Sequence, residues 1–185
     1  MQLFGIWLRP RGRPFSTRSM TDVHVRAMTK ADLTRVGELA GGLVRLHHGW
    51  DTRRFFLVDG VEEGYRWFFS RELGKPGVVL LVAEVDGVIA GYVYGTLEGR
   101  DWAKLLDAHG AIHDIYVADT HRRGGVARAL MHAGIAALQG QGATQIVLST
   151  ATPNTQAQAL FASMGFRATM IEMTRSPATV PPGDT

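Results

Sequence analysis

The 185-residue sequence predicts one α/β domain built on a mixed, mostly antiparallel β-sheet. Two apolar runs, 78–85 and 88–97, flank the dipeptide Asp86-Gly87, which is the pattern of a β-hairpin with a two-residue turn. A strand-like run at 111–117 then precedes a helical pattern at 126–140 and another apolar run at 145–150. This succession predicts a right-handed crossover between two parallel strands.

Hydrophobic periodicity predicts the other elements. A first strand is expected at 23–29, and Thr29 with Asp32 forms a capping arrangement for the helix that follows. In that helix the apolar residues recurring at helical spacing are Leu33, Val36, Ala40, Leu43 and Leu46. The rest of the chain reads as a loop at 47–60, helices at 61–72 and 153–165, and a last strand at 166–174.

The charge distribution divides the chain into three parts. Of the 20 Lys and Arg residues four lie in 1–19, which contains no acid, so 16 remain against 17 acidic residues. We expect a basic N-terminal extension at 1–19, a folded domain at 20–175 and a C-terminal tail at 176–185. The near balance in the domain gives no support for nucleic-acid binding.

Composition excludes several other classes of protein. No apolar run approaches the roughly 18 residues of a spanning helix, so no membrane association is expected. Cysteine is absent, which excludes a disulfide framework and a thiolate zinc site and suits a cytoplasmic location. The adjacent residues His47 and His48 lack a suitably spaced third ligand, and no metal is expected.

Residues 121–131, "HRRGGVARALM", join the predicted strand 111–117 to the helix 126–140. The first N–H groups of a helix lack partners within it and lie at the positive end of its dipole. Glycines at 124 and 125 permit close approach to the backbone, and arginines at 122 and 123 add donors suited to phosphate. The junction is either an ordinary connection or a diphosphate site, although neither a P-loop nor a Rossmann motif is present.

Three segments in order resemble the GNAT superfamily of N-acetyltransferases. Residues 122–127, "RRGGVA", match its [Q/R]-x-x-G-x-[G/A] signature, and the preceding "HDIYVADTH" is similar to its fourth strand. Further on, "TPNTQAQALFASMGF" resembles its N-x-x-A-x-x-L-[Y/F]-x-x-x-G-F segment. The element order from about 23 to 174 agrees as well. The resemblance implies a GNAT-like sheet with a splayed parallel pair, 111–117 and 145–150, and helices on both faces.

The same resemblance implies an acetyl-CoA cosubstrate and assigns residues to it. The loop that holds the pyrophosphate corresponds to Arg122, Arg123, Gly124, Gly125, Val126 and Ala127. The strand that pairs with the pantetheine arm corresponds to Ile115, Tyr116 and Val117, and Asn154 matches a residue on the pantetheine side. Phe161 stands where many members carry a tyrosine that protonates the departing thiolate; it is either at the cofactor or in the core.

Acetylation of an amine needs a base, because a lysine-like ammonium has a pKa of about 10. His113 stands where polyamine-acetylating members carry a glutamate, and Asp114 competes with it for the role. Regular alternation would place His113, Ile115 and Val117 on one face of the strand and Asp114 on the other. A backbone N–H of this strand, such as that of Val117, would stabilise the tetrahedral intermediate.

The resemblance therefore implies an N-acetyltransferase that moves an acetyl group from acetyl-CoA to a primary amine. With no cysteine available, direct attack in a ternary complex is the simpler mechanism. The acceptor is a small molecule or a peptide amine, and a homodimer is left open. The alternatives are a non-catalytic acyl-CoA-binding or regulatory module of the same fold and a plain interaction domain that binds no CoA.

Overall fold

The computed structural model describes residues 22–175, so the predicted extension 1–19 and tail 176–185 lie outside the described residues. The elements are β1 (Val23–Ala27), α1 (Leu33–Trp50), α2 (Val61–Glu72), β2 (Val78–Val85), β3 (Val88–Glu98), β4 (His109–Val117), α3 (Val126–Gly140), β5 (Ile146–Leu148) and α4 (Thr155–Ser163). Short 3₁₀ turns at Lys30–Asp32 and Asp119–His121 precede α1 and α3.

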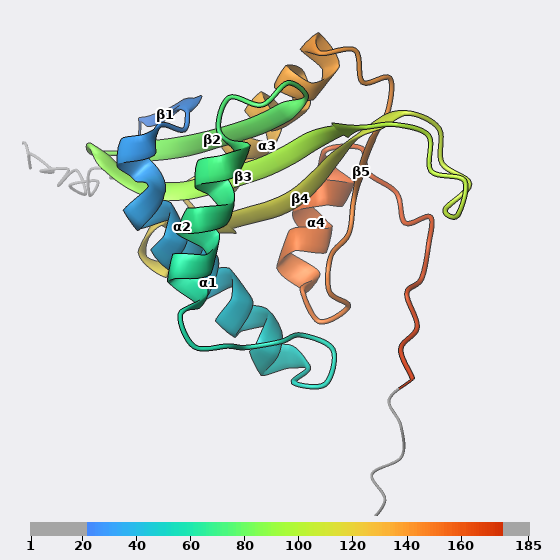
Figure 1. The fold of residues 1–185 in the computed structure, drawn as a ribbon, viewed down its shortest axis with the longest axis horizontal. Helices are drawn as coiled ribbons and strands as arrows, with labels where there is room; N and C mark the ends of the chain where they lie inside the picture. Colours follow the sequence, from blue (N-terminus) through green and yellow to red (C-terminus); the bar gives the residue numbers. More distant parts are fainter. Residues whose placement is uncertain (1–21, 176–185) are drawn as a thin grey trace, which may run out of the picture.

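The strands form one sheet in the order β1-β2-β3-β4-β5. Neighbouring strands are antiparallel except β4 and β5, which are parallel and joined through α3. Helices α1 and α2 cover one face of the sheet and α3 covers the other (Figure 1). This architecture confirms the predicted fold class, including the hairpin, whose turn residues Asp86 and Gly87 have φ of 51° and 76°.

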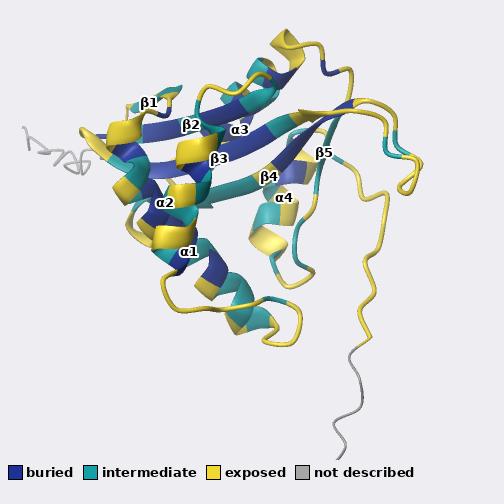
Figure 2. Cartoon of the chain, viewed as in Figure 1, coloured by how far each residue is buried: buried dark blue, intermediate teal, exposed yellow. Residues whose placement is uncertain are grey.

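Two apolar cores lie on the two faces of the sheet, whose strands are largely buried (Figure 2). The core under α3 includes Leu130, Met131 and Leu138, as the periodicity of that helix predicts. The core under α1 and α2 is richer in aromatic residues and centres on Phe69, Tyr92 and Tyr94. No helix within residues 22–175 has both the length and the hydrophobicity needed to cross a membrane.

The structure corrects the boundaries predicted after residue 46. The helix α1 continues to Trp50, so His47 and His48 belong to its last turn and only the following residues form the loop. The Nδ1 atom of each histidine lies at hydrogen-bond distance from a backbone carbonyl oxygen, and these two contacts help to hold this end of the helix. The expected core positions Leu43 and Leu46 are only partly buried, because Gly41 and Val44 face the core instead.

The predicted last strand at 166–174 does not form. Residues 166–175 run in an extended conformation and pair with no strand among the described residues (Figure 1). Met170, Ile171 and Met173 are 83%, 86% and 90% exposed. A strand needs a partner for its backbone groups, and the local sequence does not specify one. The contact of this segment with the α1–α2 loop is an ion pair between Arg54 and Glu172.

An extra residue in β4 breaks the regular register with β3. Tyr94 faces Asp114, but the next residue, Gly95, faces Ile112, so His113 has no partner on β3. This is a β-bulge, which bends a strand and redirects its side chains. The ladder between β4 and β5 ends at the same place, with the pair Ile112 and Leu148.

Candidate functional site

Within residues 22–175, no strand lies beside the edge of β4 from His113 to Val117 on the β5 side. The parallel ladder joins only residues 110–112 of β4 to residues 146–148 of β5. Beyond Ile112 the strand β4 continues for five residues, and β5 has already ended. The predicted splay of the parallel strand pair is therefore present.

The hydrogen bonds to β3 determine which backbone groups face this open edge. Ala118 donates its N–H to the Ala90 carbonyl at 2.8 Å. Hydrogen-bonded pairs recur at every second residue of an antiparallel ladder, so the register makes Tyr116–Tyr92 and Asp114–Tyr94 the next such pairs. The N–H groups of Ile115 and Val117 consequently point away from β3, toward the open edge.

The N-terminus of α3 lies just beyond the end of β4. Ala129 is the first residue to close a helical hydrogen bond, to the Gly125 carbonyl at 3.0 Å. The N–H groups of Val126, Ala127 and Arg128 therefore have no acceptor within the helix. These donors and the helix dipole make the loop 122–127 suited to an anion.

Gly125 is the N-cap residue of α3 and has a φ of 85°. This left-handed conformation favours glycine even without a ligand. A Cβ built on Gly125 would meet no atom of residues 22–175 within 4 Å, so the backbone there is open to a bound group. Arg123, also in the loop, has a φ of 64°, an uncommon value for a residue other than glycine.

The two arginines of the loop differ in their surroundings. Arg122 forms an ion pair with Asp119 at 2.6 Å, and its Nε donates to the Val117 carbonyl at 3.4 Å. Its guanidinium also lies over the Tyr116 ring at 5.6 Å. Both arginines are exposed, and Arg122 braces the loop against β4 through these contacts.

The β-bulge changes the predicted distribution of side chains on β4. Ile112, Ile115 and Val117 pack in the core under α3. His113 contacts Tyr94 and Thr96, and Asp114 accepts from the Tyr92 hydroxyl, so both lie on the face covered by α1 and α2. The expectation that His113 shares a face with Ile115 and Val117 is wrong, because the extra residue shifts the alternation by one.

Asp114 lies in a weakly hydrated position. Its Oδ2 accepts a hydrogen bond from the Tyr92 hydroxyl at 3.2 Å, and Tyr92 itself is fully buried. Burial raises the pKa of the Asp114 carboxyl, an effect that the Tyr92 hydrogen bond and the nearby His113 and His47 partly oppose. A buried carboxylate is costly unless it is paired, and one hydrogen bond from Tyr92 does not offset this cost. The group is therefore suited to bind a cation.

His113 is more accessible. Its ring lies 5.1 Å from that of Tyr94 between centroids, and its side chain is 40% exposed. The Nε2 atom is 2.6 Å from the Thr96 hydroxyl and 3.7 Å from a carboxylate oxygen of Glu98. Thr96 was not among the residues expected at the site, since a threonine in an apolar strand gives no sign in the sequence that it will contact a histidine of the next strand.

The other candidate residues have structural contacts. Asn154 caps α4 by accepting from the Ala157 N–H at 3.2 Å. Phe161 is 6% exposed and packs against Phe166, which supports the core alternative for this position. The side chain of Tyr116 faces α1, where a Cβ on Gly42 would lie 2.8 Å from its hydroxyl.

A hollow of about 480 Å³ lies at the other end of β4, beside Glu98, His109 and Thr144. It does not include any residue of 113–117. A ligand that pairs with an exposed strand edge occupies an open surface, so the edge and the adjoining helix N-terminus define the candidate site better than this hollow does.

A profile of the Acetyltransferase (GNAT) family matches residues 44–166, about two thirds of the chain. The chain belongs to this acetyltransferase family. The matched region contains the open edge of β4 and the loop 122–127, and it confirms the resemblance found in the sequence. Membership supports acyltransferase activity of the general GNAT type.

Individual GNAT relatives agree with this membership. The human protein N-acetyltransferase 8 is 33% identical over 97 residues, which are 52% of this chain and 42% of the human protein. A variant of the BH1408 protein from Bacillus halodurans has a TM-score of 0.73 at 20% identity, covering 83% of this chain and 99% of that one. The aminoglycoside N-acetyltransferase AAC(6')-Iy in complex with CoA has a TM-score of 0.65 at 20% identity, covering 92% and 99%.

The TM-scores show that the chain has the GNAT fold. The kind of acceptor is inferred from the site. The aligned region spans less than half of the human protein, and the two structures share only the fold with this chain at such identities.

Proposed function

We propose that the protein is an N-acetyltransferase that transfers an acetyl group from acetyl-CoA to a cationic primary amine. The observation that carries the proposal is the open edge of β4 leading directly to the N-terminus of α3. A strand edge with free N–H groups suits the amide-containing pantetheine arm, and the helix N-terminus suits the pyrophosphate. The solved complex of a related fold with CoA supports this assignment.

The proposed cofactor contacts follow from the geometry of this edge. Ile115 and Val117 present N–H groups to the pantetheine arm, with Tyr116 between them facing α1. The free N–H groups of Val126 and Ala127, with Gly124, Gly125 and the exposed Arg123, hold the pyrophosphate. Arg122 keeps the loop in place, and Asn154 positions α4 by capping it.

We propose that the acceptor amine approaches from the side of α1 and α2. Asp114 and Glu98 place two carboxyl groups on this face near the bulge, and both suit an ammonium group. His113 removes a proton from the ammonium, and the neutral amine attacks the thioester carbon. The carbonyl oxygen, negatively charged in the intermediate, accepts from a free backbone N–H at the bulge end of this edge, because the Val117 N–H lies four residues from His113, at the pyrophosphate end.

The reaction is completed when the tetrahedral intermediate collapses and CoA leaves. The C–N bond has formed, the C–S bond breaks, and the sulfur leaves with the electron pair. An ammonium and acetyl-CoA thus yield an acetamide, CoA as the thiol and one proton released to solvent. A thiol with a pKa of about 8.5 is an adequate leaving group near neutrality, so the buried Phe161 need not supply an acid.

The experiment is a thiol-release assay with acetyl-CoA and a panel containing a polyamine, an aminoglycoside, amino acids and a peptide with a free N-terminus. Mass spectrometry identifies the acetylated product. We expect acceptor-dependent release with at least one amine and a loss of about 100-fold or more in His113→Gln. CoA binding without acceptor-dependent release would instead establish the non-catalytic acyl-CoA-binding module.

A further inference from the structure

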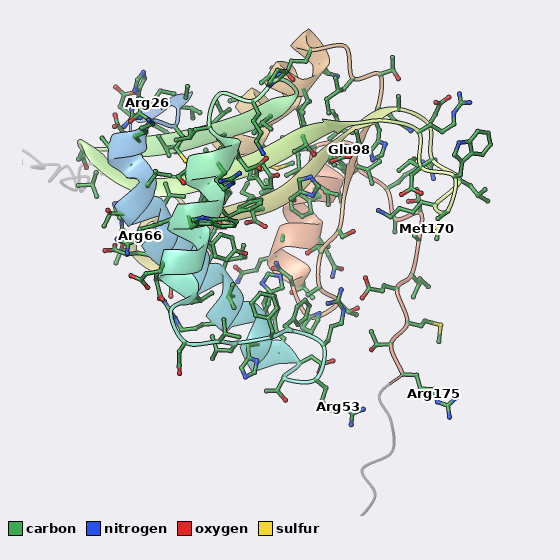
Figure 3. All side chains as sticks on the ribbon, in the orientation of Figure 1. Arg26, Arg53, Arg66, Glu98, Met170 and Arg175 are labelled. Carbon is green, nitrogen blue, oxygen red and sulfur yellow. The ribbon has the colours of Figure 1, made fainter. Side chains whose placement is uncertain are left out.

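We propose that Glu98 and Thr96 form a positioning relay that fixes the tautomer of His113 and leaves its Nδ1 atom to take the acceptor's proton. The proposal rests on the proposed function, in which His113 is the base. Thr96 and Glu98 both belong to β3, and the β-bulge turns His113 toward them from β4. Figure 3 shows Glu98 near the end of β3, where the chain leaves for the loop to β4.

The hydrogen-bonding capacity of the three side chains determines which group donates and which accepts in each hydrogen bond of the relay. The Thr96 hydroxyl lies 2.5 Å from the Glu98 carboxylate and 2.6 Å from Nε2 of His113. An ionised carboxylate only accepts, and a hydroxyl has one proton to donate. Thr96 therefore donates to Glu98 and accepts from His113, which requires the proton of the neutral ring to be on Nε2.

This order leaves the other ring nitrogen with a free lone pair. Within residues 22–175, no hydrogen bond of the His113 ring involves Nδ1. The side chain as a whole is 40% exposed, so the ring is partly open to an acceptor. A base held by a third group, with its reactive nitrogen directed to the substrate, is the general arrangement of an activated catalytic histidine.

A rigid aromatic platform holds the ring in this orientation. The His113 ring packs on Tyr94, whose own ring contacts Phe68 and Phe69 at centroid distances of 5.5 and 5.6 Å. Tyr94 and Phe69 are buried in the core under α1 and α2. Because these rings are fixed by packing, a small set of hydrogen bonds is enough to define the orientation of His113.

The relay also places the negative charge of Glu98 beside the His113 ring, which becomes positively charged during the reaction. When Nδ1 takes a proton, the ring becomes an imidazolium with the Glu98 carboxylate 3.7 Å from Nε2. Asp114, on the same face of the sheet, adds a second acidic group near the ring. The proton moves from the acceptor nitrogen to Nδ1, and no proton needs to leave Thr96 or Glu98.

The test combines nitrogen NMR with kinetics on full-length protein. The sequence has seven histidines, and the His113→Gln variant assigns the signal of His113 in ¹⁵N-histidine-labelled protein. Four variants are compared with wild type: Thr96→Ser keeps the hydroxyl, Thr96→Val removes it at similar volume, Glu98→Gln removes the charge, and Glu63→Gln is a control on α2. Thermal melts verify that each is folded.

We expect the neutral ring of His113 to be the Nε2–H tautomer in wild type and Thr96→Ser. We expect a mixture in Thr96→Val and in Glu98→Gln, because a glutamine amide can donate to Thr96 as well as accept from it. In the thiol-release assay kcat should fall about 10- to 100-fold in Thr96→Val and Glu98→Gln, with KM for acetyl-CoA unchanged. Thr96→Ser should stay within about threefold of wild type, and Glu63→Gln should match it.

An Nδ1–H tautomer in wild type would overturn the relay, and so would equal kcat values for Thr96→Val and Thr96→Ser. The NMR measurement needs no substrate, so it separates this proposal from the proposed function. A wild-type protein that acetylates no amine but shows the Nε2–H tautomer would refute the catalytic function and leave the hydrogen-bond order established.

Discussion

His113 and Asp114 are neighbours in the sequence, and their side chains lie on the same face of the sheet. His113 packs on Tyr94, and Asp114 accepts from the hydroxyl of Tyr92, two residues earlier on β3. A regular strand would send the two side chains to opposite faces. The β-bulge thus brings an imidazole and a carboxyl group together where the β4–β5 ladder ends.

Asp114 is expected to reduce stability at neutral pH. Burial raises its pKa, so the folded state binds its proton more tightly than the unfolded state does. The free energy of unfolding therefore decreases as the pH rises from the ordinary pKa of 3.8 through the folded value. We expect Asp114→Asn to raise Tm at pH 7 and to weaken amine binding. A lower Tm for Asp114→Asn at pH 7 would contradict this account.

Gly125 is expected to be essential for cofactor binding for two separable reasons. Its φ of 85° disfavours most side chains, and the space before it is open for the pyrophosphate. Asn tolerates this conformation better than Glu and adds no charge. In a thermal-shift titration with acetyl-CoA, Gly125→Glu should lose the ligand-induced stabilisation while Gly125→Asn retains part of it. Full stabilisation of Gly125→Glu would disprove the placement of the pyrophosphate.

Asp32 is expected to stabilise the junction of β1 and α1. Two hydrogen bonds from Arg26, at 2.7 and 2.9 Å, together with bonds from Thr29, hold the pKa of Asp32 at about 2. Because this pKa is below its ordinary value of 3.8, the stabilisation is present at neutral pH and disappears as the pH falls from about 4 to about 2. Asp32→Asn should lower the free energy of unfolding by about 2 kcal/mol at pH 7.

The matched control for Asp32 is the exposed ion pair of α1. Arg35 and Glu38 lie 2.8 Å apart with side chains 38% and 55% exposed. Glu38→Gln should change the free energy of unfolding by less than about 0.5 kcal/mol. Urea titrations at pH 7 and pH 2 compare the two variants, and an equal effect of both at pH 7 would refute the role of Asp32.

Phe161 is expected to matter for packing more than for chemistry. Its ring is buried under α3 with Phe166. Phe161→Ala should lower the free energy of unfolding by about 3 to 5 kcal/mol, measured by urea denaturation. If the loss is below about 1 kcal/mol while acetyl transfer collapses, the ring acts at the cofactor and the core assignment is wrong.

Much of the fold was predictable because its signals are local. The turn Asp86-Gly87, the start of α3 after Gly125 and the apolar face of α3 all follow from short stretches of sequence. The strand predicted at 166–174 does not form, because pairing depends on a partner that the local sequence does not specify.

The site was predictable in part for the same reason. The loop 122–127 carries its own pattern of glycine and arginine. The bulge at His113 carries none, since any residue of that strand could be the extra one, and the register with β3 decides it. The contact of His113 with Thr96 joins residues 17 apart in the chain and depends entirely on that register.

The measurement that most directly tests the central claim is amide hydrogen exchange of Ile115 and Val117 with and without CoA. Their N–H groups face the open edge of β4, whereas the N–H of Tyr116 faces β3 and serves as the internal reference. We predict that saturating CoA slows exchange at Ile115 and Val117 by at least about tenfold relative to Tyr116. Unchanged exchange at both residues under saturating CoA would contradict the assignment of this edge as the cofactor site.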